Sequence, residues 1–280
     1  MLEMLTVDRI IKNALEEDLG WGDVTTDSTI PKGTAIKGFF IAKEQGVVCG
    51  IEVCKRVYEI MDDAIAFEIL IIDGLMAQKG DVIARISGPA RSILKGERVS
   101  LNLLQRMSGI ATAASKYAEA VQGTIARVVD TRKTMPGLRI LDKYSVLTGG
   151  CHNHRFNLSD LVLIKDNHIK AAVGITAAVK AAKEKLSHTL KIEVEVESLE
   201  QLKEALTAGA DIIMLDNMSL EMMREAVQIT KGKALLEASG NVALEGNRSV
   251  KAIAQTGVDI ISVGALTHSV SAMDISLRFV

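Results

Sequence analysis

The chain has 280 residues, 48% of them hydrophobic, and its 33 Lys and Arg nearly balance its 35 Asp and Glu. This length can bury one large core or two modest ones. The near-neutral balance excludes a field that would gather nucleic acid over the whole protein, so any site for a polyanion must be local. No apolar run reaches the roughly 18 residues of a membrane helix, and the acidic, amphipathic start is unlike a signal peptide.

The three cysteines, Cys49, Cys54 and Cys151, form neither a Cys-x-x-Cys metal pair nor an even disulfide framework. This usage fits a reducing compartment. We therefore expect a soluble, cytoplasmic protein that binds neither membranes nor nucleic acid.

The N-terminal part of the chain mixes helices with short strands. Apolar residues recur at helical spacing from Leu5 to Leu19 and stop at Gly20, which predicts a helix with a glycine C-cap. A second helical stretch covers Ile51–Met61. Short β-type runs lie at residues 37–43, 65–71 and 82–87. The mixture predicts a small α+β domain.

Two helical patterns follow, at residues 92–107 and 110–121, with Gly109 between them. A glycine between two helical patterns is typical of a helix end. We therefore expect the passage between two domains at Gly109.

Strand-like and helical runs then alternate, which predicts a parallel sheet. The expected strands are residues 126–129, 161–164, 192–196, 212–215, 235–238 and 260–263. The spacing favours a β/α barrel, incomplete because a closed one has eight strands, over a doubly wound open sheet. No Gly-x-Gly-x-x-Gly dinucleotide motif follows any of these strands.

Polar residues follow each predicted strand. They are residues 130–133, 165–168, 195–197, 216–217, 239–241 and 264–265. In a β/α barrel these loops converge at the C-terminal rim, where active sites are built. Such loops are polar in most α/β proteins, but uncommitted ones carry more Ser, Gly and Pro, so six charged or glycine turns favour a site.

Three carboxylates, Glu193, Glu195 and Glu197, alternate with apolar residues, so a strand would place them on one face. Buried parallel strands are normally apolar throughout, and unpaired buried charge is costly. We expect this face to line a wet mouth rich in cations. The alternative is an exposed edge strand, which the flanking helical patterns disfavour.

Cations that can balance these acids are dense near the predicted rim. They are Arg132, Lys133, Arg139, His154, Arg155 and Lys165. Guanidinium forks bind carboxylate or phosphate oxygens at two points, so Arg132 and Arg155 suit a dicarboxylate or a diphosphate. A structural salt-bridge network is the alternative, and it can account for Arg139 and Lys143.

Zinc is an alternative for Cys151, His152 and His154 together with His168, because sulfur and imidazole are proper zinc ligands. We reject it because the fixed charge of Arg155 opposes a divalent cation and no second cysteine completes a tetrahedral set.

Two glycine turns follow the last two predicted strands. They comprise Ser239, Gly240 and Asn241, and then Gly264 and Ala265. Each opens a helical stretch, so main-chain N–H groups there can hold a monophosphate.

The chain resembles the quinolinate phosphoribosyltransferases, decarboxylating enzymes also called nicotinate-nucleotide pyrophosphorylases, over nearly its whole length. The motifs that carry the resemblance are EDLGWGDVT at 17–25, ER at 97–98, SGIAT at 108–112, DTRKT at 130–134, NHR at 153–155, LIKDNH at 163–168, EVEV at 193–196, LDN at 215–217, EASG at 237–240 and VGA at 263–265. Met135 and Cys151 depart from the residues expected there.

The resemblance implies an N-terminal α+β sandwich domain, residues 1–108 with the tail 269–280, and an open β/α barrel, residues 109–268. It implies a homodimer in which Arg98 completes the neighbouring site. It maps quinolinate to Arg132, His154, Arg155 and Lys165, with Lys133 between the two substrates. Glu195 and Asp216 would serve 5-phosphoribosyl pyrophosphate (PRPP) and its Mg2+.

The chemistry fits these roles. Departure of pyrophosphate leaves positive charge on the ribose, which Glu195 and Asp216 can stabilise, and the two lysines, Lys133 and Lys165, can offset the repulsion between two anionic substrates. Two alternatives share the scaffold or its loops: a phosphoribosyltransferase-like protein associated with molybdate transport, and a non-catalytic sensor of a phosphorylated metabolite.

Overall fold

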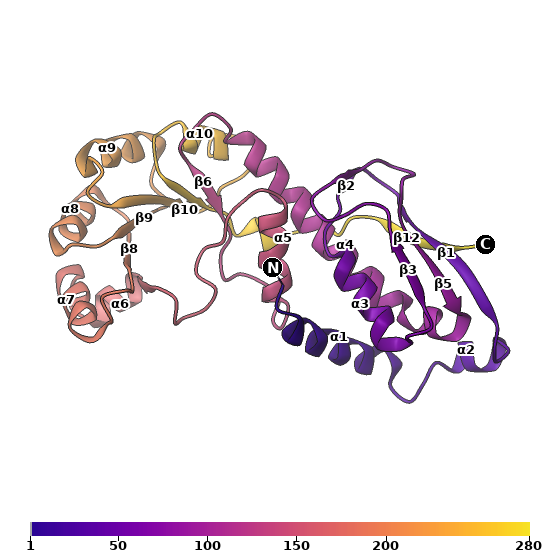
Figure 1. Cartoon of the computed structure of the whole chain (residues 1–280). Helices are drawn as coiled ribbons and strands as arrows, with labels where there is room; N and C mark the ends of the chain where they lie inside the picture. The colour runs from indigo at the N-terminus through magenta and orange to yellow at the C-terminus, as the bar shows by residue number, and fades with distance from the viewer. Residues whose placement is uncertain (1) are drawn as a thin grey trace. The chain divides into compact units, whose positions relative to one another are not determined.

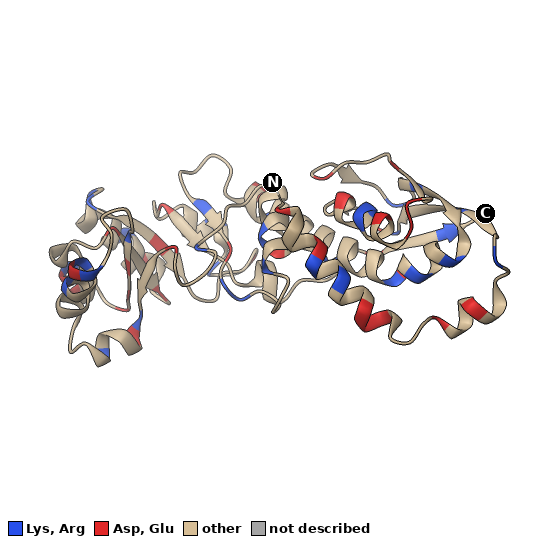
Figure 2. Ribbon diagram, turned by 60° about the horizontal axis from the view of Figure 1, so that its bottom comes forward, with Lys and Arg blue, Asp and Glu red and all other residues tan. Residues whose placement is uncertain are grey.

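The computed structural model describes residues 2–280, which form two compact units. The first unit comprises the chain up to Ser115, Thr134–Gly150 and Ser269–Val280. The second comprises Lys116–Lys133 and Cys151–His268. Acidic and basic residues are interspersed along the helices and strands of both units (Figure 2). Among residues 2–280, no helix is long and apolar enough to cross a membrane.

The first unit is built on an antiparallel sheet with strand order β12-β1-β5-β3. Its strands are β1 (Ala35–Ala42), β3 (Ala66–Ile69), β5 (Val82–Pro89) and β12 (Ile275–Phe279), with a separate pair β2 (Gly46–Val47) and β4 (Met76–Ala77). Its helices are α1 (Met4–Leu19), α2 (Val24–Thr29), α3 (Ile51–Met61), α4 (Ala90–Ala120, which runs on into the second unit) and α5 (Arg139–Thr148). The predicted helix before Gly20 and the predicted α+β fold are both confirmed.

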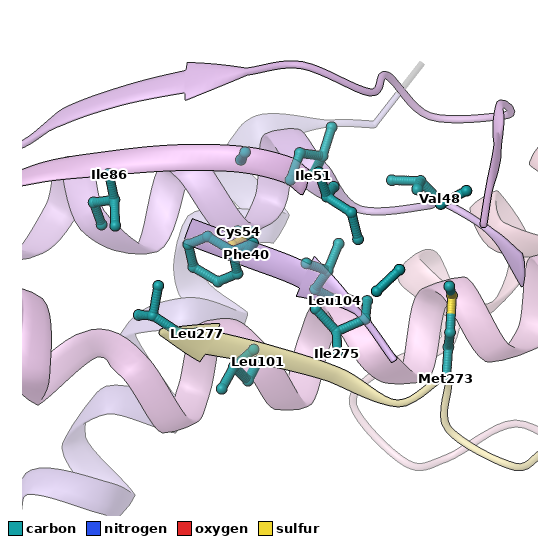
Figure 3. Packing of buried hydrophobic residues seen from close by; sticks show 14 of the residues in the cluster. Phe40, Val48, Ile51, Cys54, Ile86, Leu101, Leu104, Met273, Ile275 and Leu277 are labelled. Atoms are coloured by element: carbon teal, nitrogen blue, oxygen red, sulfur yellow. The ribbon is translucent and has the colours of Figure 1, made fainter. Parts of the chain in front are cut away.

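Side chains of the last strand, β12, pack into the core of the first unit. Leu277 pairs with Phe40 across the sheet, and both side chains are buried. Figure 3 shows Ile275 beside Leu104 of α4, and Met273 belongs to the same cluster. Residues near the C-terminus therefore complete a core that the N-terminal residues begin.

The predicted helix break at Gly109 is wrong, because α4 runs unbroken from Ala90 to Ala120. A Cβ at position 109 would lie 2.2 Å from the main-chain oxygen of Ser271. The glycine therefore permits the segment before β12 to pass close to the helix, and it does not end the helix.

The second unit is a parallel sheet of six strands in the order β6-β11-β10-β9-β8-β7. The strands are β6 (Arg127–Val129), β7 (Val162–Ile164), β8 (Ile192–Val196), β9 (Ile212–Asp216), β10 (Leu235–Ser239) and β11 (Ile260–Ser262). The helices are α6 (Asp166–Ala171), α7 (Ile175–Lys185), α8 (Leu199–Ala208), α9 (Leu220–Thr230), α10 (Val250–Ala254) and α11 (Ala265–His268). Helices α7, α8 and α9 lie along one side of the strands (Figure 1). The strands β6 and β7 stay unpaired with each other, so this is the open β/α barrel that the sequence predicts.

Serine caps fix where three of the helices start. Ser198, Ser219 and Ser249 begin α8, α9 and α10, and each side chain accepts a hydrogen bond from the N–H three residues further on. Such caps satisfy main-chain donors that the first helical turn leaves free. They hold the ends of the loops that follow the strands.

Candidate active site

Two adjoining cavities lie at the carboxyl ends of the parallel strands. The larger has a volume of about 620 Å³ and the smaller about 320 Å³. Both are lined by Thr131, Lys133, Lys165, Ser239 and Ser262. The two lysines therefore face two chambers at once.

Every residue of the second unit to which the sequence assigns a catalytic, substrate or metal role lines one of these chambers or both. The larger chamber holds Glu195, Asp216, Gly240, Asn241, Gly264 and Ala265 in addition to the shared residues. The smaller one holds Arg132, His154 and Arg155. Carboxyl ends of neighbouring parallel strands meet at one edge, so residues far apart in sequence converge there.

The smaller chamber combines cations with an apolar lining. Arg132 and Arg155 lie in it beside the side chains of Leu163 and Met214. Burial and the nearby charge of Arg132 lower the pKa of Arg155. Two partly buried guanidinium groups that repel each other favour an anion between them. The apolar side chains suit a flat ring.

His154 is held from several sides. Its main-chain N–H donates to the buried carboxylate of Asp130 at 2.8 Å, and its Nε2 lies 3.2 Å from Glu193 and 3.3 Å from Glu237. Burial opposes protonation of the ring, but the two carboxylates outweigh burial and raise the pKa of His154 to about 10. The other ring nitrogen, Nδ1, accepts the N–H of Arg155 at 2.7 Å. A proton therefore sits on Nε2, and in the charged ring that this pKa favours a second proton replaces the contact between Nδ1 and the N–H of Arg155.

The same geometry bears on metal binding. His154, Glu193 and Glu237 are the described residues that are spaced closely enough to hold a metal ion. A ligating Nε2 would have to lose its proton and pass it to Nδ1, which already accepts a main-chain N–H. The arrangement therefore suits a buried ion cluster better than a metal site.

The expectation of three carboxylates in a wet mouth is wrong for Glu193 and Glu197. Glu193 is completely buried, and burial together with repulsion from Glu237 raises its pKa against the pull of His154. Glu195 lines the larger chamber. Glu197 follows the end of β8, is exposed, and lines neither chamber. One strand face therefore runs from the core, through the chamber, to the surface.

Two acidic residues, Glu195 and Asp216, line the larger chamber. The ammonium of Lys165 lies 2.6 Å from Glu195, whose side chain is only 12% exposed. Asp216 accepts a hydrogen bond of 2.9 Å from the side-chain amide of Asn217. The lysine and the amide orient two carboxylates on neighbouring strands toward one space.

The glycine turns close the larger chamber. Gly240 has a φ of 93°, and a Cβ there would lie 2.1 Å from the side-chain oxygen of Asn217. A Cβ at Gly264 would lie about 3 Å from both His268 and Lys133. These positions let the main chain approach the chamber where a side chain would block it.

Comparison with known proteins identifies the family. Residues 23–108 match the model of the quinolinate phosphoribosyl transferase N-terminal domain, and residues 110–278 match that of the C-terminal domain. The chain belongs to the quinolinate phosphoribosyltransferase family. Among its relatives, a protein of Bacillus subtilis named probable nicotinate-nucleotide pyrophosphorylase is 42% identical over 98% of this chain and 93% of the relative. One of Methanocaldococcus jannaschii with the same name is 46% identical over 97% and 96%.

Solved structures agree with this assignment. The nicotinate-nucleotide pyrophosphorylase of Francisella tularensis is 40% identical and superposes with a TM-score of 0.93 over 100% of this chain and 98% of that one. Neither alternative function raised from the sequence is supported by these relatives.

One predicted residue of the family lies elsewhere, and others were missed. Arg98 belongs to the first unit, is exposed on α4, and lines neither chamber. Asn217 and His268 line the larger chamber and Glu237 the smaller, although none was assigned a role in the site from the sequence. Asn217 and Glu237 stand within motifs quoted above, and His268 follows the last glycine turn, so position after a strand was the available signal.

Proposed function

We propose that the two chambers bind the two substrates of the family reaction, quinolinate in the smaller and PRPP in the larger. The enzyme transfers phosphoribose from PRPP to quinolinate with loss of carbon dioxide, giving nicotinate mononucleotide and pyrophosphate in NAD biosynthesis. The observation that carries the assignment of chambers is the pair Lys133 and Lys165, which line both. Two anions that must meet need cations at their boundary.

Quinolinate fits the smaller chamber by charge and shape. Arg132 and Arg155 would hold its two carboxylates, and His154 with Lys165 adds positive charge. Leu163 and Met214 would cover the ring. Nicotinate has one carboxylate fewer and would leave one of the guanidinium groups unpaired.

PRPP fits the larger chamber. The turns at Gly240 and Gly264 would hold the 5-phosphate through main-chain N–H groups, with Ser239, Asn241 and Ala265 beside them. Glu195 and Asp216 would hold the ribose hydroxyls. The same two carboxylates offer the oxygen ligands that Mg2+ prefers, so the residues fit this ion. Bound there with PRPP, Mg2+ would neutralise charge on the leaving pyrophosphate.

The residues act by position and charge. The bond from the anomeric carbon to pyrophosphate breaks, and the electron pair leaves with the pyrophosphate oxygen. Glu195 and Asp216 stabilise the positive charge left on the ribose. The pyridine nitrogen donates its electron pair to that carbon. The ring, now cationic, accepts the electron pair that is released when carbon dioxide departs. A proton from solvent then bonds to the ring carbon that carbon dioxide has left. Loss of one charged side chain that contacts the substrates should raise the free energy of the transition state by on the order of 3 kcal/mol.

Turnover tests the function. Protein incubated with quinolinate, PRPP and Mg2+ should yield nicotinate mononucleotide and carbon dioxide in equal amounts. Nicotinate in place of quinolinate is the matched control. Equal consumption of nicotinate would contradict the assignment of two-carboxylate recognition to Arg132 and Arg155.

We also propose a homodimer in which Arg98 completes the site of the neighbouring subunit. Arg98 is exposed on α4 and does not line either chamber, which is consistent with such a role. Mixing Arg98→Ala with Lys165→Ala chains should restore up to about a quarter of wild-type activity, because half of randomly formed dimers would hold one intact site of two. No recovery in mixtures shown to exchange subunits would contradict a shared site.

Two further proposals complete the assignment. We keep residues 1–108 with 269–280 and residues 109–268 as the two domains, supported by family models that end at 108 and begin at 110. We also propose a cytoplasmic location, supported by three buried cysteines that form no disulfide.

A further inference from the structure

Arg248 holds the loops behind the larger chamber without lining it. Its guanidinium group donates to the main-chain oxygens of Ser239, the last residue of β10, of Gly240, which follows it, and of Met218, which follows β9. The contacts with Gly240 measure 2.9 and 3.1 Å and the contact with Ser239 measures 3.2 Å. One planar fork therefore ties together the loops after two neighbouring strands.

The direction of these carbonyl groups fixes the direction of the N–H groups that follow them. In a trans peptide the C=O and the next N–H point to opposite sides. Because Arg248 holds the oxygens of Ser239 and Gly240, the N–H groups of Gly240 and Asn241 point away from it. Both residues line the larger chamber. Among residues 2–280, these two N–H groups donate to no protein acceptor.

The loop after β10 adopts a backbone conformation that contacts from other residues must stabilise. Gly240 has a φ of 93°, Asn241 of 49°, and the adjacent Asn217 of 53°. Asparagine tolerates left-handed backbone better than other residues with a side chain, but less well than glycine. The side-chain contact between Asn217 and Asn241 is long, at 3.4 Å. The guanidinium group of Arg248 makes the shorter and more numerous contacts.

We propose that Arg248 is a positioning residue that shapes the loop after β10 into a receptor for the monophosphate group of PRPP. This inference rests on the proposed function of the larger chamber and adds to it the group that keeps the receptor preorganised. Arg248 acts through the main chain and touches no substrate. Lysine cannot replace it, because an ammonium group cannot span three carbonyl oxygens in a fixed plane.

Steady-state kinetics of Arg248→Ala test the proposal. A 5-phosphate contact that is equal in ground state and transition state affects KM and spares kcat. We expect the KM for PRPP to rise about tenfold or more, the KM for quinolinate to change less than roughly twofold, and kcat to fall less than roughly threefold. Arg248→Lys should lie between the variant and the wild type. Added methylguanidinium should restore part of the PRPP affinity of Arg248→Ala and should leave that of the wild type unchanged.

The control is Arg224→Ala, which removes a half-exposed arginine of α9 whose contact with Glu221 is 3.7 Å long. It should match the wild type. An unchanged KM for PRPP in Arg248→Ala, or equal rises in both KM values, would overturn the proposal. If Arg248→Ala does not fold, Arg248→Lys decides, and wild-type kinetics in that variant would overturn it.

Failure of the proposed function can be distinguished from failure of the inference on Arg248. Wild-type protein without turnover would contradict that function, and calorimetry with ribose 5-phosphate would still test Arg248. We expect binding to Arg248→Ala to be weaker than to wild type by about tenfold. Equal binding would overturn the inference alone.

Discussion

The two chambers are built to recognise anions in different ways. The smaller one depends on side-chain charge that is anchored in the core, since His154 rests on the buried carboxylates of Glu193 and Glu237. The larger one depends on main-chain shape, since its glycine turns allow the backbone to reach the cavity. The difference predicts that changes of charge should damage the first and changes of shape the second.

Lys133 lies where the two chambers meet, so its loss should have the largest effect. Lys133→Ala should lower kcat/KM about 10²- to 10³-fold, because the boundary between two anions loses a cation. Both KM values should rise. Thermal unfolding should stay near wild type, because the side chain is exposed. Lys180→Ala, on the exposed face of α7, is the control, and wild-type kinetics in Lys133→Ala would remove this residue from the mechanism.

Gly240→Ala should distinguish the roles of the two chambers most clearly. The added Cβ would collide with the Asn217 side chain at 2.1 Å, and φ is 93°. We expect the KM for PRPP to rise about 10- to 100-fold and the KM for quinolinate to change little.

Gly232→Ala is the matched control for that variant. Gly232 has a similar φ of 74°, but nothing lies within 4 Å of its added Cβ. It should lower stability by about 1 kcal/mol and leave both KM values unchanged. Equal kinetics in the two variants would show that the collision at Gly240 has no effect on the phosphate loop.

Local patterns predicted the elements that frame the site. The parallel strands and the residues after them could be found because alternation and polar turns are visible within a few residues. Gly109 was misjudged because its reason is a contact with Ser271, far along the chain. Distance along the chain also hid the contact between His154 and Glu237. The contacts of Arg248 with Gly240 span only 8 residues, but no periodic pattern marks a side chain that binds main-chain oxygens of a loop. Short sequence periods cannot show which distant residues meet.

The buried ion cluster of His154, Glu193 and Glu237 should also affect the stability of the fold, by less than it affects substrate binding. The pKa of His154 is about 10 in the folded protein and ordinarily 6.5, so the folded state binds the extra proton more tightly. This stabilisation is complete below pH 6.5 and is lost as pH rises toward 10. Urea unfolding should show wild-type stability falling over this range by on the order of 2 kcal/mol more than that of His154→Gln. The comparison with the variant removes the contribution of other groups that titrate in the same range. Parallel curves for the two proteins would mean that Glu193 and Glu237 do not hold a charged ring, and that the smaller chamber depends on Arg132 and Arg155 for its positive charge.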